Sequence, residues 1–346
     1  MSDTINISIL GASGFVGAEL IKLCLNHPNI NISSMSANSQ AGKKIKIDTS
    51  LELDEKYSSI DEIDFRNVDY VFNCLPNIKL HSLINSLPSN LRIIDLSADF
   101  RLDDINEYKN WYGFEHSSSE INEKFVYGLS ELKRKDIKNA ENIANPGCYA
   151  TSVLVPLLPL LENNMIKNDN IIIDSKSGYS GAGKTKKTED LKLEVDENIK
   201  TYGVGDHKHI AEINQEIKKA SKMNNSEVFF SANLIPVERG ILSNIYVNPI
   251  KGTSFDEVYS CLYNAYKSEK YINILDQNEI PITKDVVNTN KVILGLKKGY
   301  KEDVYCIVSV LDNLLKGAAG QAMQNFNIMN KFNAVSYTHL TLPTKA

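Results

Sequence analysis

Three glycines near the start of the chain constrain its fold more than any other feature. They follow the apolar segment 5–10 in the spacing Gly11-x-x-Gly14-x-x-Gly17, and residues 18–25 after them have helical periodicity. A strand, a glycine turn and a helix in this order are typical of a dinucleotide-binding α/β domain, because the glycines let the backbone approach a pyrophosphate at the helix N-terminus. The alternative is a tight turn without a ligand. The pattern predicts a cofactor loop made of Gly11, Ser13, Gly14, Phe15, Val16 and Gly17.

Apolar segments that alternate with helix-compatible ones extend this pattern over the first half of the chain. Predicted strands lie at 30–35, 70–74 and 92–96. Strands that alternate with helices pair in parallel through right-handed crossovers. We therefore expect an α/β fold whose N-terminal half is an NAD(P)-binding Rossmann domain. The acidic stretch 48–69 has no clear pattern and is interpreted as a surface excursion.

The pattern of predicted helices and strands changes after Asn145-Pro146-Gly147. A helix is predicted from Cys148, and Pro156 and Pro159 should kink or end it. The strands predicted beyond it have alternating or β-branched patterns and lie at 171–174, 227–230, 241–248, 292–296 and 304–310. Such strands favour a mixed or antiparallel sheet, so we expect an α+β domain for catalysis and dimerisation.

Two domains follow from these patterns, and a length of 346 residues suits two hydrophobic cores. We predict an NADP-binding Rossmann domain at 1–147, completed by a C-terminal helix within 311–330. The catalytic and dimerisation domain is predicted at 148–310. Residues 334–346 fit neither pattern, and we interpret them as a non-native segment or a disordered native tail.

Composition excludes several other classes of protein. Asp and Glu outnumber Lys and Arg by 43 to 38, and the net charge of −5 disfavours a nucleic-acid partner. No apolar run approaches the roughly 20 residues of a membrane-spanning helix, and no signal-peptide pattern begins the chain, so we expect a cytoplasmic protein. The five cysteines are odd in number and form no CxxC pair, which predicts neither a disulfide framework nor a metal site.

The region after the second predicted strand bears on the choice of cofactor. An NAD site usually places Asp or Glu about 20 residues after the glycine loop to hold the ribose 2′-hydroxyl. Here the corresponding region carries hydroxyls and lysines, namely Ser36, Ser39, Lys43 and Lys44. Because a 2′-phosphate would not be repelled there, the sequence predicts NADP(H) over NAD(H). The alternative is an ordinary solvated basic loop.

One cysteine stands at a predicted helix N-terminus. Cys148 follows Asn145-Pro146-Gly147, where the helix dipole and free amide groups favour thiolate over thiol. The other cysteines are interpreted as structural or as part of the wall of the cofactor cleft: Cys24, Cys74, Cys261 and Cys306. Cys148 is therefore the predicted nucleophile.

Seven motifs occur in order along nearly the whole chain. They are GASGFVGAEL at 11–20, DLSADFRL at 95–102, YGLSE at 127–131, NPGCYAT at 145–151, SGAGK at 180–184, HKHIAEI at 207–213 and GAAGQA at 317–322. Together they resemble the N-acetyl-γ-glutamyl-phosphate reductase family. The resemblance implies NADPH-dependent reduction of N-acetyl-glutamyl 5-phosphate to the 5-semialdehyde and phosphate, with a thioester on Cys148. It also implies a homodimer or homotetramer.

An imidazole is expected near Cys148, because collapse of a thiohemiacetal needs a proton acceptor. His207 and His209 are the two candidates, and they precede a helical pattern. The resemblance favours His209 as the acid/base and His207 as a substrate or structural partner. A capping or surface role for both is the alternative, and no third residue completes a metal site. The remaining histidines are interpreted as surface or structural: His27, His81 and His116.

Positively charged side chains are the candidates for binding an anionic substrate. Arg101 is suited to a bidentate contact, and a salt bridge to Asp99 is the alternative. Arg239 is a second candidate. Lys184 ends a small-residue loop that is suited to phosphate or to the nicotinamide amide. We predict substrate contacts from Arg101, His207, Lys184 and Arg239, and cofactor contacts from Ser180 and Gly181.

Three other functions remain as alternatives. In aspartate-semialdehyde dehydrogenase the catalytic cysteine usually follows Asn, where this chain has Gly147, and the histidine follows an Arg-x-x-Gly-His segment. Here Arg239-Gly240 continues into Ile241. A reductase of carrier-linked aminoadipate phosphate in lysine synthesis is a second alternative. An NADP-sensing regulator is the third, and the presence of both Cys148 and His209 argues against it.

Overall fold

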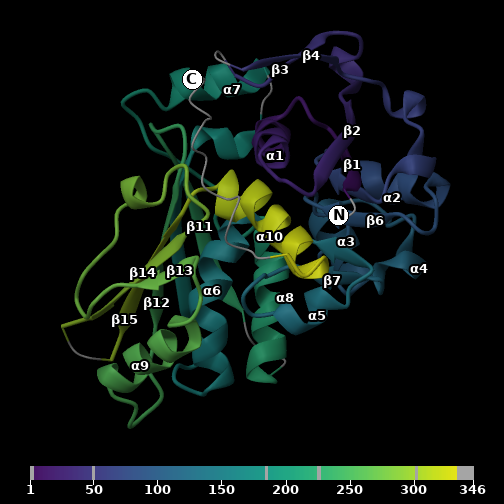
Figure 1. Cartoon of the computed structure of the whole chain (residues 1–346). Coiled ribbons are helices and arrows are strands. Elements are labelled where there is room, and N and C mark those ends of the chain that lie inside the picture. Colours follow the sequence, from purple (N-terminus) through teal and green to yellow (C-terminus); the bar gives the residue numbers. More distant parts are fainter. Residues whose placement is uncertain (1–3, 49–50, 184–185, 224–226, 301–302, 333–346) are drawn as a thin grey trace. The chain divides into compact units, whose positions relative to one another are not determined.

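The chain passes from one structural unit to another between Pro146 and Gly147, immediately before Cys148. The computed structural model describes residues 4–48, 51–183, 186–223, 227–300 and 303–332. One unit comprises Met1–Pro146 and Ala318–Ala346, and the other comprises Gly147–Gly317. Figure 1 shows the helices and strands of both units.

A six-stranded parallel sheet forms the centre of the first unit, with the strand order β2-β1-β5-β6-β8-β7. Its strands are β1 (Ile5–Leu10), β2 (Ile30–Ser36), β5 (Tyr70–Asn73), β6 (Arg92–Asp95), β7 (Phe125–Tyr127) and β8 (Asn142–Ala144). Ile7, Ile9 and Leu10 of β1 are fully buried, as expected for a parallel sheet covered on both faces. The predicted Rossmann-type sheet is confirmed. The short strands β7 and β8 were not indicated by the sequence pattern.

The helices of the first unit include one from the end of the chain. They are α1 (Phe15–Leu25), α2 (Lys79–Leu83), α3 (Ile105–Tyr112), α4 (Ser119–Asn122), α5 (Arg134–Lys138) and α10 (Gly320–Met329). A hydrogen bond of 2.9 Å joins His27 Nε2 to Asn327 Oδ1 of α10, and the ring of Phe326 lies 5.0 Å from that of Tyr70. Helix α10 is therefore part of the core of this unit, next to α1.

A small antiparallel pair includes a strand inside the stretch 48–69, which was expected to be an unpatterned excursion. It consists of β3 (Lys44–Lys46) and β4 (Glu52–Lys56). Four of the five β4 side chains are exposed, and four of the five residues are charged. A strand of this kind has no apolar alternation, which is why its sequence shows no strand pattern.

A seven-stranded mixed sheet forms the second unit, with the order β10-β11-β9-β12-β15-β14-β13. Its strands are β9 (Ile171–Gly178), β10 (Lys200–Tyr202), β11 (Val228–Ile235), β12 (Ile241–Val247), β13 (Ile272–Ile274), β14 (Val292–Lys298) and β15 (Tyr305–Leu311). The pairs β9–β11 and β13–β14 are parallel and the other pairs are antiparallel. The predicted mixed sheet is confirmed.

Four helices accompany this sheet: α6 (Cys148–Glu162), α7 (Lys186–Glu194), α8 (His209–Ser221) and α9 (Phe255–Tyr266). Helix α6 packs against β12 and β15 and also against α8 (Figure 1). Ser152 of α6 and Ser243 of β12 join their hydroxyls at 2.7 Å, so small side chains let the helix approach the sheet closely. Among the helices of the described ranges, none combines the length and the apolar character that a bilayer-spanning segment needs.

The prolines of α6 do not end the helix, which continues to Glu162. A proline has no N–H to offer the carbonyl four residues earlier, so Pro159 leaves the carbonyl of Val155 without its helical partner. The hydroxyl of Tyr266 in α9 donates to that carbonyl at 2.5 Å. A bond from a neighbouring helix thus satisfies the group that proline frees, and the helix persists.

Candidate active site

The glycine loop joins β1 to α1, and two of its three glycines are required by the protein's own packing. Gly11 has a φ of +74°, and a Cβ on it would lie 2.6 Å from the carbonyl oxygen of Cys74. A Cβ on Gly17 would lie 2.6 Å from the carbonyl oxygen of Ala12. A Cβ on Gly14 would meet nothing closer than 3.7 Å. The space beside Gly14 is thus open, as the close approach of a ligand requires.

The N-terminus of α1 fits the pyrophosphate of a dinucleotide. Its N-cap, Gly14, offers no side-chain acceptor, and the first turn holds no acidic residue. The first N–H groups of a helix have no intrahelical acceptor, and the helix dipole attracts negative charge there. Ser13 lies directly before this N-cap, and Phe15, Val16 and Gly17 are the first three residues of α1. These residues would hold the cofactor through their backbone.

The residues predicted to distinguish NADP from NAD follow β2. Ser36 ends this strand with a buried hydroxyl that has no partner among the described residues, whereas Ser39 is exposed. Lys43 and Lys44 are both exposed, and Nζ of Lys44 lies 3.1 Å from Oδ1 of Asp54. Lys43 has no acidic partner within the described ranges. Of the two lysines, Lys43 is therefore the more available to a phosphate.

Arg101 is buried and binds backbone carbonyls of its own unit. Its Nε donates to the carbonyl of Asn145 at 2.9 Å, and its Nη2 donates to the carbonyl of Leu96 at 3.0 Å. Oxygens of Asp99, the alternative partner, accept the backbone N–H groups of Ile78, Leu80 and His81. Arg101 thus braces a carbonyl that lies three residues before Cys148 in the chain, and its contact with substrate stays a prediction.

Cys148 is the first residue of α6, and side chains of α8 pack against the glycine before it. The backbone N–H of Gly147 donates to Oε2 of Glu212 at 3.0 Å, and Glu212 is fully buried. Oε1 of Glu212 lies 3.9 Å from Nε2 of His209. A Cβ on Gly147 would lie 2.5 Å from each of these two atoms. Only glycine lets the imidazole and the carboxylate come so close to the start of the nucleophile's helix.

Partial burial keeps His207, the first histidine of the motif, neutral. The His207 ring lies 4.7 Å from that of His209 and 5.3 Å from that of Tyr149, centroid to centroid. Its Nδ1 accepts the backbone N–H of His209 at 3.1 Å, so the ring proton belongs on Nε2. Desolvation lowers the pKa of His207 to about 4. Such a group is a weak proton acceptor at neutral pH, which favours His209 as the acid/base.

The predicted loop after β9 is anchored by its own serine. Oγ of Ser180 donates to the carbonyl of Glu238 at 2.6 Å and accepts from Nδ2 of Asn313 at 2.9 Å. The hydroxyl is buried, whereas Gly181 next to it is exposed. Gly181 is therefore the accessible member of the predicted pair. Lys184 lies outside the described residues.

Arg239 forms an ion pair with a buried carboxylate. Its Nε lies 3.2 Å from Oδ2 of Asp312, and its Nη1 donates to Oδ1 of Asn288 at 2.9 Å. Oδ1 of Asp312 also accepts the backbone N–H groups of Leu314 and Leu315. Arg239 thus holds the segment that leads to the end of the second unit, and its contact with substrate stays a prediction.

The remaining cysteines differ from Cys148 in their surroundings. Desolvation raises the pKa of the thiols of Cys24, Cys74, Cys261 and Cys306. Each of these is held as a neutral thiol at neutral pH. Only Cys148 among the five begins a helix, so it remains the candidate nucleophile. Within the described ranges, no group of three or more His, Cys, Asp and Glu side chains is arranged to hold a metal ion.

Sequence reasoning gave no role to Glu212 or to two tyrosines near the thiol. The hydroxyls of Tyr149 and Tyr202 hydrogen-bond at 2.9 Å. Burial, with a smaller contribution from Cys148, raises the pKa of both phenols, so both are neutral donors beside the nucleophile. Glu212 follows His209 by three residues, which is one helical turn, and that spacing was the available signal.

Two family models match the chain. "Semialdehyde dehydrogenase, NAD binding domain" matches residues 6–140, and "Semialdehyde dehydrogenase, dimerisation domain" matches residues 148–313. The first range contains the glycine loop and the second begins at Cys148. A nicotinamide cofactor in the first unit follows from this match.

Curated relatives are similar over almost the whole chain. The N-acetyl-gamma-glutamyl-phosphate reductase of Ehrlichia chaffeensis is 42% identical over 337 residues, which are 96% of this chain and 97% of that protein. The chain belongs to the N-acetyl-gamma-glutamyl-phosphate reductase family. A chloroplastic protein of Arabidopsis thaliana, named as a probable N-acetyl-gamma-glutamyl-phosphate reductase, is 42% identical over 328 residues, 94% of this chain and 82% of that protein.

Solved structures show that the fold of this member of the N-acetyl-gamma-glutamyl-phosphate reductase family is shared more widely. Aspartate semialdehyde dehydrogenase II of Vibrio cholerae superposes with a TM-score of 0.73 at 17% identity, over 95% of this chain and 99% of that one. The Candida albicans aspartate semialdehyde dehydrogenase, solved with NADP, gives 0.70 at 20% identity over 94% and 99%. At these identities the likeness is one of fold alone.

Proposed function

We propose that this chain catalyses the NADPH-dependent reduction of N-acetyl-L-glutamyl 5-phosphate to N-acetyl-L-glutamate 5-semialdehyde and phosphate, a step of arginine biosynthesis. The observation that carries the proposal is the packing of His209 and Glu212 against Gly147, directly before Cys148. It brings an imidazole and a buried carboxylate to the helix start that bears a thiol. The similarity to curated reductases over 96% of the chain supports the choice of substrate.

Cys148 opens the reaction as the nucleophile. Its thiolate attacks the carbonyl carbon of the acyl phosphate, a C–S bond forms, and the C–O bond breaks with its electron pair leaving on phosphate. The first-turn N–H groups of α6 have no intrahelical acceptors. They are placed to stabilise the negative oxygen of the tetrahedral species, and the product of this half is an acyl thioester.

His209 is proposed to move the proton in the second half. When bound, NADPH would supply a hydride to the thioester carbonyl carbon. The imidazolium of His209 would give a proton to the resulting oxyanion, so that a thiohemiacetal forms. The imidazole of His209 accepts the hydroxyl proton of that species, the C–S bond breaks, and Cys148 leaves as thiolate while the aldehyde forms. Glu212, with Oε1 3.9 Å from Nε2 of His209, orients the ring and favours its protonated form.

The substrate and the nucleophile are tested together in the oxidative direction. The wild type, Cys148→Ala and the control Cys261→Ala are given NADP⁺ with phosphate and N-acetyl-L-glutamate 5-semialdehyde, or with aspartate semialdehyde. We expect NADPH formation with the acetylated substrate in the wild type and in Cys261→Ala, and none in Cys148→Ala. Faster turnover of aspartate semialdehyde would contradict the substrate, and activity of Cys148→Ala would contradict the nucleophile.

We propose NADP(H) as the preferred cofactor. The support is the exposed Lys43, which has no acidic partner in the described part of the chain, on the segment that follows β2. Lys43→Ala should raise KM for NADPH about tenfold and leave KM for NADH unchanged, since a charged contact to the 2′-phosphate is lost. Lys46→Ala, also exposed in the same region, is the matched control. A wild type with the lower KM for NADH would contradict the preference.

We also propose that the second sheet forms a homodimer, or a homotetramer built from it, through its outer face. Ile172 of β9 pairs with Phe229 of β11 on one side and with Tyr246 of β12 on the other. These three side chains are 46%, 54% and 38% exposed, respectively. A row of large exposed apolar side chains across three strands is typical of an interface.

The oligomer is tested by light scattering after size exclusion. Phe229→Asp and Tyr246→Asp should lower the molar mass toward that of one chain, because each buries a carboxylate in the interface. Phe114→Asp, which changes a side chain of similar exposure (52%) in the other unit, is the control. An unchanged molar mass in both sheet variants would contradict this interface.

A further inference from the structure

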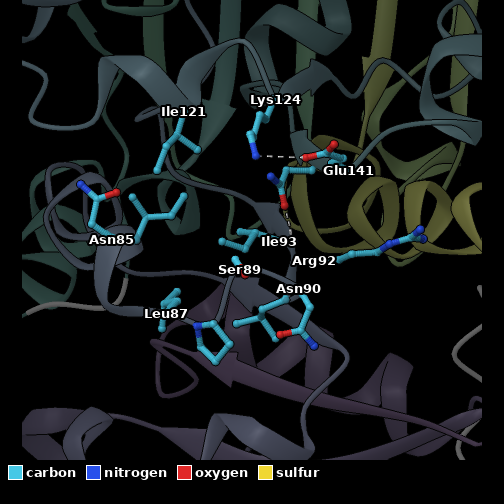
Figure 2. Close-up of a pocket in the computed structure, with 13 residues that line it drawn as sticks. Asn85, Leu87, Ser89, Asn90, Arg92, Ile93, Ile121, Lys124 and Glu141 are labelled. Carbon is cyan, nitrogen blue, oxygen red and sulfur yellow. Dashed lines mark hydrogen bonds and ion pairs between the residues drawn. The ribbon is translucent and has the colours of Figure 1, made fainter.

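A pocket lies at the amino-terminal edge of the six-stranded sheet. Its volume is ≈ 490 Å³, and it is lined by residues 84–85 and 87–93, by Ile121 of α4, and by Lys124, Glu141 and Asn142 at the starts of β7 and β8 (Figure 2). The glycine loop follows the carboxyl end of β1, and all strands of this sheet are parallel. The pocket is therefore at the opposite edge from the loop proposed to bind the cofactor.

Aliphatic side chains line part of the pocket, although polar atoms make up the larger share of its surface. The aliphatic residues are Ile84, Leu87, Pro88, Leu91, Ile93 and Ile121. None of the described residues that line it is aromatic, so the pocket has no flat ring on which a base could stack. The pocket therefore suits a small polar ligand that also has an aliphatic part.

A buried amide with an unused donor completes the pocket. Asn142, at the start of β8, is 7% exposed. Its Oδ1 accepts the backbone N–H of Ile93 at 2.9 Å, which fixes the orientation of the amide. Its Nδ2 has no partner among the described residues, although the side chain lines the pocket. This N–H group is open to the pocket, so an acceptor on a ligand can bind it in place of water.

A cation and an anion stand next to each other at the pocket. Strands β7 and β8 pair with Phe125 opposite Asn142, so the residues that precede them, Lys124 and Glu141, become neighbours. Nζ of Lys124 lies 3.6 Å from Oε2 of Glu141, and their side chains are 57% and 70% exposed (Figure 2). An ion pair so exposed contributes little to stability, and it can exchange for the charges of a ligand at low cost.

Arg92, the other positively charged residue that lines the pocket, already interacts with Tyr70. Arg92 donates from Nη1 to the hydroxyl of Tyr70 at 2.8 Å, and its guanidinium carbon lies 5.7 Å from the centre of the Tyr70 ring. Figure 2 shows its side chain extending away from Lys124 and Glu141. The charges available to a ligand are therefore one positive and one negative.

We propose that this pocket binds a free α-amino acid with an aliphatic side chain. Lys124 and Nδ2 of Asn142 hold the carboxylate, Glu141 holds the ammonium group, and the aliphatic wall receives the side chain. A zwitterion replaces both halves of the Lys124–Glu141 pair at once, whereas an acid or an amine alone leaves one half unpaired. The volume lies within the range of about 300–1,000 Å³ of small-molecule sites.

The charge requirement is tested by calorimetry on the full chain with three compounds of similar length. L-Norleucine carries both charges, hexanoate only the negative one and pentylamine only the positive one. We expect millimolar or tighter binding of norleucine, and affinities about tenfold weaker or worse for the other two, because each lacks one charged hydrogen bond. No detectable binding of norleucine, or equal affinities for the three compounds, would overturn the proposal.

Two variants test whether norleucine binds in this pocket. Lys124→Gln removes the exposed charge, and Asn142→Asp keeps an acceptor for the N–H of Ile93 while it replaces the donor by a carboxylate. Each should weaken norleucine binding about tenfold or more, and Lys138→Gln, an exposed lysine of α5, should leave it unchanged. If Asn142→Asp does not fold, Lys124→Gln alone decides. Equal affinity in Lys124→Gln and Lys138→Gln would overturn the site, and neither readout depends on the chemistry at Cys148.

Discussion

The carboxylate of Glu212 accepts the backbone N–H of Gly147 at 3.0 Å. Gly147 is the N-cap of α6, and the nucleophile proposed here is the next residue. The other oxygen of the same carboxylate lies 3.9 Å from Nε2 of His209. One fully buried side chain thus ties the start of the nucleophile's helix to the proposed acid/base, in the manner of a third group that orients a nucleophile and its base.

Replacing Glu212 by Gln tests the effect of its negative charge, because the two side chains have nearly the same size and shape. Glu212→Gln keeps an acceptor for the N–H of Gly147 and removes the negative charge beside His209. We expect kcat to fall about tenfold to hundredfold with little change in KM. The limb of the pH–rate profile that reports the imidazole should move to lower pH, because the imidazolium loses its counter-charge.

The control for this variant lies one turn further along α8. Glu216→Gln changes another buried glutamate, which pairs with Lys219 at 2.7 Å. Steady-state kinetics of the two variants at several pH values provide the measurement. If both variants keep the wild-type profile, or if both lose activity equally, Glu212 has no special relation to the acid/base.

The glycine loop offers a matched pair of substitutions. Gly14→Ala places a Cβ no closer than 3.7 Å to any atom of the protein, so it should leave the melting temperature nearly unchanged. It should raise KM for NADPH about tenfold, since the methyl group fills the space left for the cofactor. Gly17→Ala places a Cβ 2.6 Å from the carbonyl oxygen of Ala12 and should destabilise the fold by about 1–3 kcal/mol. An unchanged KM in Gly14→Ala would show that the cofactor does not approach this loop.

Acidification should destabilise the protein through three histidines that folding shields partly or wholly from water. Burial lowers the pKa of His207 from 6.5 to about 4, and it also lowers the pKa of His27 and of His116. The unfolded chain therefore takes up protons at a higher pH than the folded chain. The free energy of unfolding should be highest above about pH 6.5 and should fall as the pH decreases toward 4.

His207→Asn tests how much of the acid-induced decrease in unfolding free energy is due to His207. Asn keeps an acceptor near the position of Nδ1, which caps the backbone N–H of His209, and it does not titrate. The difference in unfolding free energy between about pH 7.5 and about pH 5 should shrink by up to about 2 kcal/mol. Urea unfolding at the two pH values measures it, and an equal fall in variant and wild type would count against a neutral, buried His207.

The hydroxyl of Tyr266 should matter for stability and not for catalysis. Tyr266→Phe leaves the carbonyl of Val155, already deprived of a helical partner by Pro159, buried without a donor. We expect a loss of about 1–3 kcal/mol of stability with kcat unchanged. Tyr263→Phe removes a hydroxyl from an exposed side chain of the same helix and is the control. Equal melting temperatures for the two variants would contradict this role of the bond.

Local patterns in the sequence were sufficient for the parts of the fold that depend on local physics. The glycine spacing predicted the loop between β1 and α1, and the position of Cys148 after Asn145-Pro146-Gly147 predicted a helix that begins at the thiol. The helix ends at Glu162, three residues beyond Pro159, so the prolines indicated its end approximately but not how the helix passes them. The donor that satisfies Val155 comes from Tyr266, 111 residues later, and no local rule contains it.

The features of the site that could not be predicted from the sequence depend on contacts between residues far apart in the chain. Glu212 reaches Gly147 across 65 residues, so the motif that contains it reveals a glutamate but not its partner. Lys43 and Lys44 are indistinguishable in sequence, and only the pairing of β3 with β4 shows that Asp54 engages one of them. Likewise, only the fold shows that Asp312 is a partner of Arg239.

The proposed mechanism passes through a covalent thioester on Cys148, which a single-turnover experiment can detect. The enzyme is mixed with N-acetyl-L-glutamate 5-semialdehyde and NADP⁺ in the absence of phosphate, so that the thioester forms and lacks its normal acceptor. We predict a burst of one NADPH per active site and, by mass spectrometry, an N-acetylglutamyl group on the peptide that contains Cys148, with neither in Cys148→Ala. Formation of NADPH by Cys148→Ala at the wild-type rate, or a burst without an adduct on Cys148, would contradict the account.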